Sequence, residues 1–241
     1  RAGSRPALDK SATVGVGAYV EGSEGRAGSF TLLPPHYKDV WYKQIPGHAH
    51  GKNTTIGFKD YAPLVFRRVR QLFGISDSDY MLSLGPEQIL GELLLGTMGS
   101  LSELFSEGKS GSFFYFSNDG RYLIKTIPHR ELLSLIHILP QYVAHIEEQP
   151  HTLLPRFMGA HRLKLPDKHK KVHFIVMTNV FSTARVIHHR YDLKGSTQGR
   201  SAGKETLERF PDVVRKDLDV LSPFAIRPTA RDALVAQAKM D

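Results

Sequence analysis

The sequence contains no cysteine among its 241 residues. Disulfide bridges and thiolate metal sites are therefore excluded, and the absence is compatible with a reducing compartment. No apolar run is long enough to form a bilayer-spanning helix. The first ten residues, RAGSRPALDK, lack both an initiator methionine and the hydrophobic segment of a secretory signal, so we expect a piece of a longer intracellular chain.

The composition is that of an ordinary folded protein with an excess of positive charge. Hydrophobic residues make up 41% and charged residues 23%, and the formal net charge is +8. Such a balance favours anionic partners, either nucleic acid, an acidic membrane face or a phosphorylated substrate. Nucleic acid ranks lowest, because no recognition helix or ladder of stacking aromatics is evident. The 12 histidines lack metal-ligand spacing, so we expect no metal site built from them.

The pattern of elements predicts an α+β fold. Residues 1–30 are rich in glycine and serine and are expected to be flexible, and residues 31–241 form the folded part. Residues 31–53 mix aromatics with prolines and are expected to pack without long regular elements. In chain order we expect a helix at 62–74, a helix at 86–105, two strands within 112–127 and a helix at 129–149 that is interrupted at Pro140. Two more strands are expected at 153–165 and 170–181, and the tail at 223–241 is expected to end in a helix.

The helix at 62–74 carries arginines beside its apolar stripe. Arg67, Arg68 and Arg70 lie away from Val65 and Val69 at helical spacing. A solvated amphipathic face is the plainer interpretation, and a cationic face toward a membrane is the alternative.

A glycine turn before a strand with an inward lysine is a candidate phosphate site. Small residues that let backbone N–H groups approach a phosphate lie in the segment GKSGS, at Gly108, Ser110, Gly111 and Ser112. In the strand RYLIKTI, alternation places Leu123, Lys125 and Ile127 on one face of a largely apolar strand. A buried ammonium needs an anion, which a nucleotide phosphate or Glu131 in the next helix would supply. This order of elements is the layout of a kinase amino-terminal lobe.

Two later segments fit the same layout. The apolar strand at 174–177 leads into a candidate hinge that would hold an adenine, formed by Met177, Asn179, Val180 and Phe181. The segment HHRYDLKGSTQGR, residues 188–200, then combines acid, base and a tight turn. It is either an ordinary surface turn or a place where phosphate is held, with Lys194 as a candidate cation.

Four segments, taken together, resemble the phosphatidylinositol phosphate kinase family in sequence order. They are FKDYAPLVFRRVRQLFGISDSDYMLSL, GKSGSFFYFSNDGRYLIKTI, MTNVFSTARVIHHRYDLKGSTQGRSA and VRKDLD. The resemblance runs from about Leu32 to Asp241 and implies an amino-terminal lobe up to about residue 181 followed by the start of a second lobe.

The resemblance implies a lipid kinase that transfers the γ-phosphoryl group of ATP to a phosphoinositide, with Mg²⁺ neutralising charge. Lys125 and Lys194 would be the catalytic cations that hold phosphate. The glycine turn would cover the phosphates, and the hinge residues would line the adenine. It further implies a cytoplasmic, peripheral protein at an acidic membrane surface, with homodimerisation as a further option and no role for nucleic acid.

Three family features do not occur in these 241 residues: the Met-Asp-Tyr-Ser-Leu segment with the catalytic Asp, the Ile-Ile-Asp metal-binding acid and the basic activation loop. We therefore expect this chain alone to be inactive, with Asp241 belonging to the helix before it. KSGSFFY resembles the 4-phosphate 5-kinases, whereas LLPPHYKDVWYKQI and TNVFS resemble the 5-phosphate 4-kinases. A non-catalytic phosphoinositide- or nucleotide-binding module is the alternative from another class.

Overall fold

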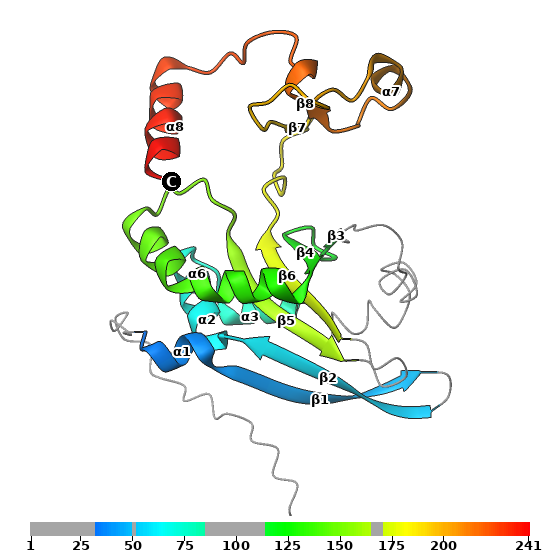
Figure 1. Cartoon of the computed structure of the whole chain (residues 1–241), viewed down its shortest axis with the longest axis vertical. Coiled ribbons are helices and arrows are strands. Elements are labelled where there is room, and N and C mark those ends of the chain that lie inside the picture. Colours follow the sequence, from blue (N-terminus) through cyan, green and yellow to red (C-terminus); the bar gives the residue numbers. More distant parts are fainter. Residues whose placement is uncertain (1–31, 50–51, 85–113, 165–170) are drawn as a thin grey trace, which may run out of the picture. The chain divides into compact units, whose positions relative to one another are not determined.

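A six-stranded antiparallel sheet carries the fold in the computed structural model, which describes residues 32–49, 52–84, 114–164 and 171–241. The chain divides into two units, 1–31 and 32–241, and only the second is described. The sheet has the order β1-β2-β5-β6-β4-β3 (Figure 1). Its strands are β1 (Val40–Ala49), β2 (Lys52–Tyr61), β3 (Phe114–Phe116), β4 (Tyr122–Ile127), β5 (Phe157–Lys164) and β6 (Lys171–Thr178).

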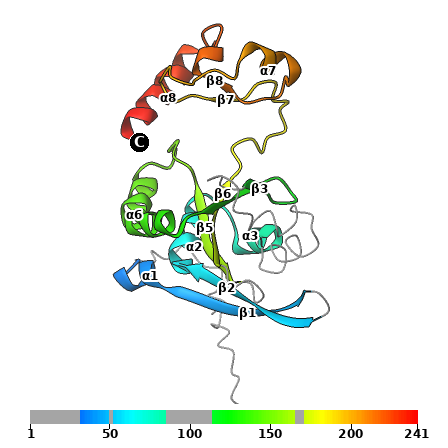
Figure 2. The same ribbon diagram turned by 45° about the vertical axis from the view of Figure 1, so that its right-hand side comes forward.

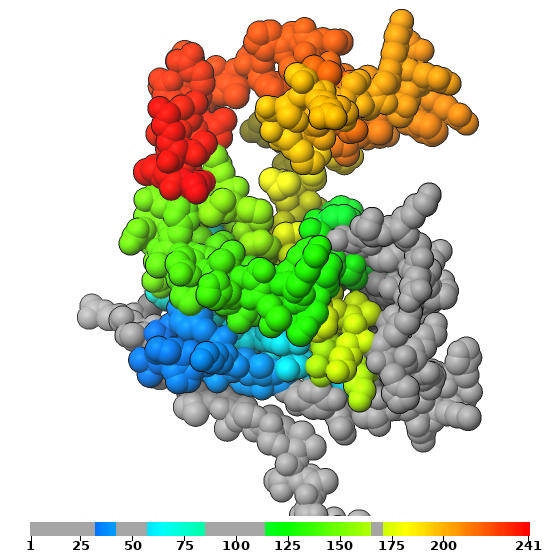
Figure 3. Space-filling view, viewed as in Figure 1, coloured from blue at the N-terminus to red at the C-terminus, as the bar shows by residue number. Residues whose placement is uncertain are grey.

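Helices lie on both faces of this sheet. They are α1 (Pro34–Lys38), α2 (Pro63–Leu72), α3 (Asp77–Leu84) and α6 (His129–Glu148). Figure 2 shows α6 on one side of the sheet and α3 on the other. In Figure 3 the green surface of α6 lies directly against the blue surface of α1. The sheet and its flanking helices confirm the α+β fold class.

The remaining described elements follow β6 in the chain. They are β7 (Tyr191–Asp192), α7 (Lys204–Arg209), β8 (Arg215–Lys216), the 3₁₀ turn η1 (Asp217–Asp219) and α8 (Pro228–Met240). β7 and β8 pair in parallel as a separate two-stranded sheet. The predicted final helix is therefore present as α8, with Asp241 directly after it.

The predicted hairpin and the first predicted helix are confirmed. β3 and β4 pair antiparallel across a turn in which Gly120 has a φ of +69°. Helix α2 starts with Pro63 at its first turn and buries Val65, Phe66 and Val69. The helix expected at 86–105 and the glycine turn at 108–112 lie outside the described residues.

The expectation of irregular structure at 31–53 is wrong. Helix α1 is followed by β1, which pairs with β2 over ten residues, from Val40 opposite Tyr61 to Ala49 opposite Lys52. Pro46 sits within β1 because β1 is an edge strand, where a residue without an N–H is tolerated.

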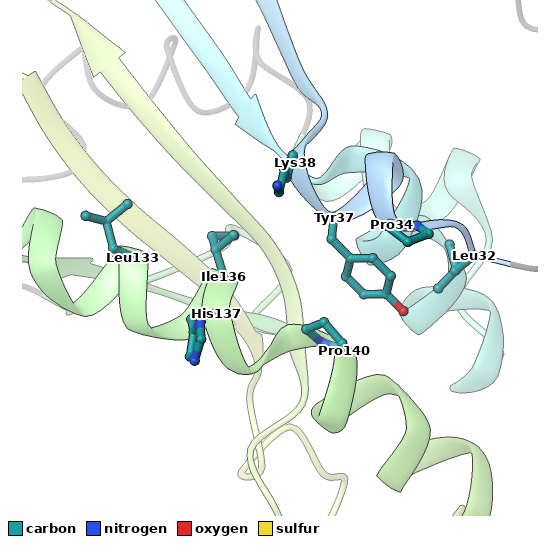
Figure 4. A pocket seen from close by; sticks show the side chains of 8 residues that line it. All are labelled: Leu32, Pro34, Tyr37, Lys38, Leu133, Ile136, His137 and Pro140. Carbon is teal, nitrogen blue, oxygen red and sulfur yellow. The ribbon is translucent and has the colours of Figure 1, made fainter.

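The expected interruption at Pro140 is also absent. Helix α6 runs for 20 residues with Pro140 inside it. A proline lacks the N–H of one helical hydrogen bond and bends a helix without always ending it. The ribbon of α6 changes direction at Pro140 in Figure 4.

Candidate functional site

Lys125 lies in the middle of β4, on the same face of the sheet as α6. It is opposite Phe114 in β3 and Ile175 in β6. Tyr122 and Ile124 point into the core on the other face, while Lys125 is half-buried. Its ammonium nitrogen lies 5.7 Å from the centroid of the Phe114 ring, a cation–π contact. The alternation predicted for this strand is confirmed.

Glu131, the acid expected beside Lys125, is exposed in the first turn of α6. The structure gives no ion pair between these two described residues. Within the described part of the chain, the Lys125 ammonium contacts the Phe114 ring and pairs with no acid. A phosphate group has the charge that would pair with it.

Asn179 joins the end of β6 to the turn between β3 and β4. Its backbone N–H donates to Arg121 O at 2.8 Å, and its side-chain amide donates to Gly120 O at 2.8 Å. Its side-chain oxygen accepts from Phe181 N at 3.0 Å. These bonds fix the chain directly after the strand, so Asn179 has a positioning role here in addition to any contact with a ring.

The other hinge residues differ in exposure. Met177 packs against the core, while Val180 is 83% exposed and the Phe181 ring carries the Arg190 guanidinium at 5.3 Å from its centroid. Of the four hinge residues, Val180 has the most exposed apolar side chain. The structure thus brings the four hinge residues together, and their contact with adenine remains a prediction.

The acid, base and turn of residues 188–200 are held together by a second segment of the chain. The Asp217 carboxylate accepts from Lys194 N at 2.9 Å, Gly195 N at 2.7 Å and Arg200 Nε at 2.7 Å. Gly195 has a φ of +66°, which a side chain would strain. The guanidinium of Arg200 holds the pKa of Asp217 below its ordinary value.

Asp219 supports the next residues in the same way. Its carboxylate accepts from Ser201 Oγ at 2.8 Å, Ala202 N at 2.9 Å and Lys216 N at 2.9 Å. Sequence reasoning singled out VRKDLD as a segment but missed that its two carboxylates, Asp217 and Asp219, accept the hydrogen bonds that hold the turn. The signal that could have found them is the pairing of two acids with a turn rich in N–H donors.

Lys194 does not stand alone as a cation. Its ammonium group bonds the Asp192 carboxylate at 2.8 Å, and its side chain is 61% exposed. An exposed pair of this kind is weak, so a phosphate could compete for the lysine. The role predicted for Lys194 therefore requires its ammonium group to leave the Asp192 carboxylate and bind a phosphate instead.

Asp241 ties α8 to the region after α6. Its carboxylate accepts from His145 Nε2 at 2.8 Å, Thr152 Oγ1 at 2.8 Å and Leu153 N at 2.6 Å. Burial opposes its ionisation, but these hydrogen bonds lower its pKa to about 2.

Neither a metal cluster nor a spanning helix occurs in the described part of the chain. Residues 32–49, 52–84, 114–164 and 171–241 contain no group of three or more His, Asp or Glu side chains able to hold a metal. The acids that would bind Mg²⁺ are thus not found among them. The described helices are also too short or too polar to cross a bilayer.

A pocket of about 530 Å³ lies between α1 and α6 (Figure 4). Tyr37 and Lys38 line one side, and Ile136, His137 and Pro140 line the other. None of the residues predicted to bind nucleotide lines it, so it is separate from that candidate site.

An antiparallel sheet with a half-buried lysine in its fourth strand, followed directly by a long helix, is the arrangement of a kinase-like amino-terminal lobe. The family model described as Phosphatidylinositol-4-phosphate 5-Kinase matches residues 95–241. The chain belongs to this family.

Curated relatives agree over most of the chain. It is 43% identical to the phosphatidylinositol 4-phosphate 5-kinase of Plasmodium falciparum, over 77% of this chain and 11% of that protein. It is 44% identical to the phosphatidylinositol 4-phosphate 5-kinase its3 of Schizosaccharomyces pombe, over 76% and 24%. For phosphatidylinositol 4-phosphate 5-kinase 8 of Arabidopsis thaliana the identity is 42%, over 79% and 23%. The chain thus spans a quarter or less of the length of these relatives.

Proposed function

We propose that this chain is the nucleotide-binding portion of a lipid kinase. The reaction is transfer of the γ-phosphoryl group of ATP to phosphatidylinositol 4-phosphate. The inositol 5-hydroxyl oxygen forms the new bond to phosphorus, the bond between that phosphorus and the β-phosphate oxygen breaks, ADP leaves, and the hydroxyl proton passes to a base. Membership of the family and the printed names of its relatives support this substrate.

The observation that carries the proposal is the position of Lys125. A half-buried ammonium on an apolar strand, with no acid paired to it among the described residues, has the charge and setting needed for a nucleotide phosphate. The glycine turn at 108–112 would cover the phosphates from above. Val180 and Phe181 would lie along the adenine, and Lys194 would hold a phosphate of the nucleotide or of the lipid.

The domain boundary and the cellular setting are part of the same proposal. The amino-terminal lobe would end near residue 181, and the segment from 188 to 219 would open the second lobe. A net charge of +8 supports a peripheral association with an acidic membrane surface. Mg²⁺ would accompany ATP, but its ligands are not among the described residues, so no step is assigned to it.

The phosphate role of Lys125 is tested by nucleotide binding to the 241-residue chain. We expect Lys125→Met to weaken ATP binding at least about tenfold, because a charge-assisted contact is lost. Lys204→Met removes the same charge from an exposed position on α7 and should leave binding unchanged. Equal binding by wild type and Lys125→Met, measured by isothermal titration calorimetry, would refute the role.

The transfer reaction is tested on the protein as isolated from its cells, with each phosphatidylinositol monophosphate in turn. Preferred labelling of phosphatidylinositol 4-phosphate supports the proposal. Preferred labelling of the 5-phosphate instead favours a 4-kinase. Nucleotide binding without transfer to any inositide favours the non-catalytic module.

A further inference from the structure

Five basic side chains gather on the α6 face of the sheet, at the opposite end of β6 from Asn179. Three of them stand side by side across neighbouring strands: Lys59 of β2 is opposite Arg162 of β5, which is opposite His173 of β6. Lys171 lies two residues before His173 and so points to the same face. His129, the first residue of α6, stacks on His173 with ring centroids 4.6 Å apart. We call Lys59, His129, Arg162, Lys171 and His173 the basic cluster.

Among the described residues, no acid pairs with a member of the basic cluster. Burial lowers the pKa of His173 most, and four basic groups lower it further, to about 4: His129, Arg162, Lys171 and Lys59. Burial lowers the pKa of Lys59, and the charges of Arg162 and Lys171 lower it further. Like charges held this close repel one another, and an anion would relieve the repulsion.

Hydration alone does not compensate the charges of the basic cluster, because part of the Arg162 guanidinium is buried. The Nε atom of Arg162 is buried and has no hydrogen-bond partner in the part of the chain that the structure describes. A buried donor of a charged group that stays without a partner is costly. Long basic side chains commonly place their charged groups in water, but the Nε atom of Arg162 is shielded from it.

Tyr61 organises the basic side chains. The ammonium of Lys59 lies 4.8 Å from the centroid of its ring, and the His173 ring lies 6.3 Å away. Burial raises the pKa of Tyr61, and Arg162 opposes that rise through its charge and its hydrogen bond. The cluster is therefore built around an aromatic residue, which limits how far its members can move apart.

We propose that the basic cluster binds a phosphate group. An arginine fork, two ammonium groups and two imidazoles provide the donors and the positive charge that a doubly charged oxyanion needs. The start of α6, a helix of 20 residues, adds partial positive charge at His129. The phosphate comes either from a free phosphate compound or from the headgroup of an anionic lipid.

The basic cluster and Asn179 lie at opposite ends of β6. Asn179 follows His173 by six positions, which is about 20 Å in an extended strand. Lys125 lies nearer and on the same face of the sheet, because Ile127, two positions further along β4, is opposite His173. Lys59 and Arg162 belong to strands on the other side of β6 from β4. The phosphate site is therefore proposed in addition to the nucleotide site, and the variant Lys125→Met separates the two.

The experiment titrates inorganic phosphate into the 241-residue chain in a chloride buffer and follows the imidazole signals of His129 and His173 by NMR. We expect phosphate to shift both signals and to raise the pH at which His173 titrates, because a bound anion favours the imidazolium. Arg162→Gln should weaken phosphate binding about tenfold. Arg209→Gln removes an equal charge from exposed α7 and should have no effect.

Three results would overturn the proposal. They are the absence of a phosphate-dependent shift at millimolar concentration, equal weakening by Arg162→Gln and Arg209→Gln, and loss of the shift in Lys125→Met, which would place the phosphate at the nucleotide site. Retention of the shift in Lys125→Met supports a separate site even if ATP binding fails.

A second arm identifies the source of the phosphate. Vesicles of phosphatidylcholine with phosphatidylinositol 4-phosphate are added in place of inorganic phosphate. If they shift the His173 signal of the wild type but not that of Arg162→Gln, the lipid headgroup is the ligand. If only inorganic phosphate shifts the signal, the ligand is a free phosphate compound. Both results support the site, and failure of both arms removes it.

Discussion

The polar side chains on the two faces of the central sheet differ in their partners, although they occupy adjacent positions. On the α3 face, Asp60 of β2 lies opposite His161 of β5, and the carboxylate meets the imidazole Nδ1 at 2.5 Å. The other imidazole nitrogen lies 3.4 Å from the Tyr80 hydroxyl of α3. On the α6 face, one residue away along each strand, Lys59 lies opposite Arg162 with no acid between them.

The difference shows which polar groups serve the fold. The Asp60–His161–Tyr80 row is closed, because the two nitrogens of the imidazole meet an acid on one side and a hydroxyl on the other. Gly159 leaves the space that this row occupies. A Cβ there would come within 2.5 Å of His161 Nε2 and 2.6 Å of the Tyr80 hydroxyl. The basic cluster on the opposite face is open, so we infer that it serves binding more than folding.

Removing a member of the closed row should have the largest effect. His161 is 9% exposed and packs against the rings of Phe58 and Phe174, with centroids 5.3 and 5.1 Å away. We expect His161→Ala to lower the free energy of unfolding by about 3 kcal/mol, because it leaves a cavity and unpaired polar groups. Urea denaturation measures this loss.

The neighbouring residue on the other face provides the control. Arg162→Ala should change the free energy of unfolding by less than about 1 kcal/mol, since no acid partner is lost. Similar losses for the two variants would contradict the distinction between a closed and an open face.

Local sequence signals were sufficient for the elements around Lys125. The Asn-Asp-Gly turn between two apolar strands predicts β3 and β4, and alternation within β4 places Lys125 on the face opposite Tyr122 and Ile124. The β1–β2 hairpin escaped prediction because Pro46 and Gly47 within β1 are typical of loops. Only the position of β1 at the sheet edge makes the proline acceptable.

Charge pairing across the chain could not be predicted from spacing. Helical spacing alone predicts that the arginines of α2 face either solvent or a membrane. The structure instead pairs Arg67 and Arg70 with Asp77, at 2.6 and 3.3 Å, and Arg68 with Glu147 at 3.1 Å. Asp77 lies in the next helix and Glu147 at the far end of α6, so both partners depend on the tertiary fold.

The basic cluster escaped prediction for the same reason. Its members come from β2, β5, β6 and α6 and become neighbours only through strand register. A shift of one residue in any pairing would send a side chain to the other face. By contrast, the face on which Lys125 lies could be predicted, because it follows from the alternation of side chains within β4 alone.

Acidification should lower the free energy of unfolding by less than the substitution His161→Ala does. The pKa of His173 is lowered from 6.5 to about 4, so the folded state binds fewer protons than the unfolded state between these values. Stability should therefore fall as the pH drops from 6.5 towards 4, by about 1 kcal/mol after allowance for solvent exposure. Carboxylates such as Asp241, whose pKa is about 2, stay ionised in this window.

Comparison with His173→Gln isolates this effect. The variant should lose less stability than the wild type between neutral pH and pH 4, as measured by thermal unfolding in chloride buffer. The groups that face His173 are Tyr61 and the rest of the basic cluster, and phosphate bound there should reduce the loss in the wild type. Identical pH profiles for the two proteins would show that the imidazole is not held neutral by its neighbours.

The smallest expected effect has the opposite sign. Lys59→Gln removes one charge from the basic cluster, so we expect a gain of no more than about 0.5 kcal/mol at low ionic strength. Lys204→Gln removes a charge that lies 3.9 Å from Glu208, four residues on, and should cost about 0.3 kcal/mol. Molar salt should abolish both changes by screening. A loss in Lys59→Gln that persists in high salt would mean that contacts of the lysine side chain with the Tyr61 ring outweigh the repulsion, and the open face would then contribute to the fold itself.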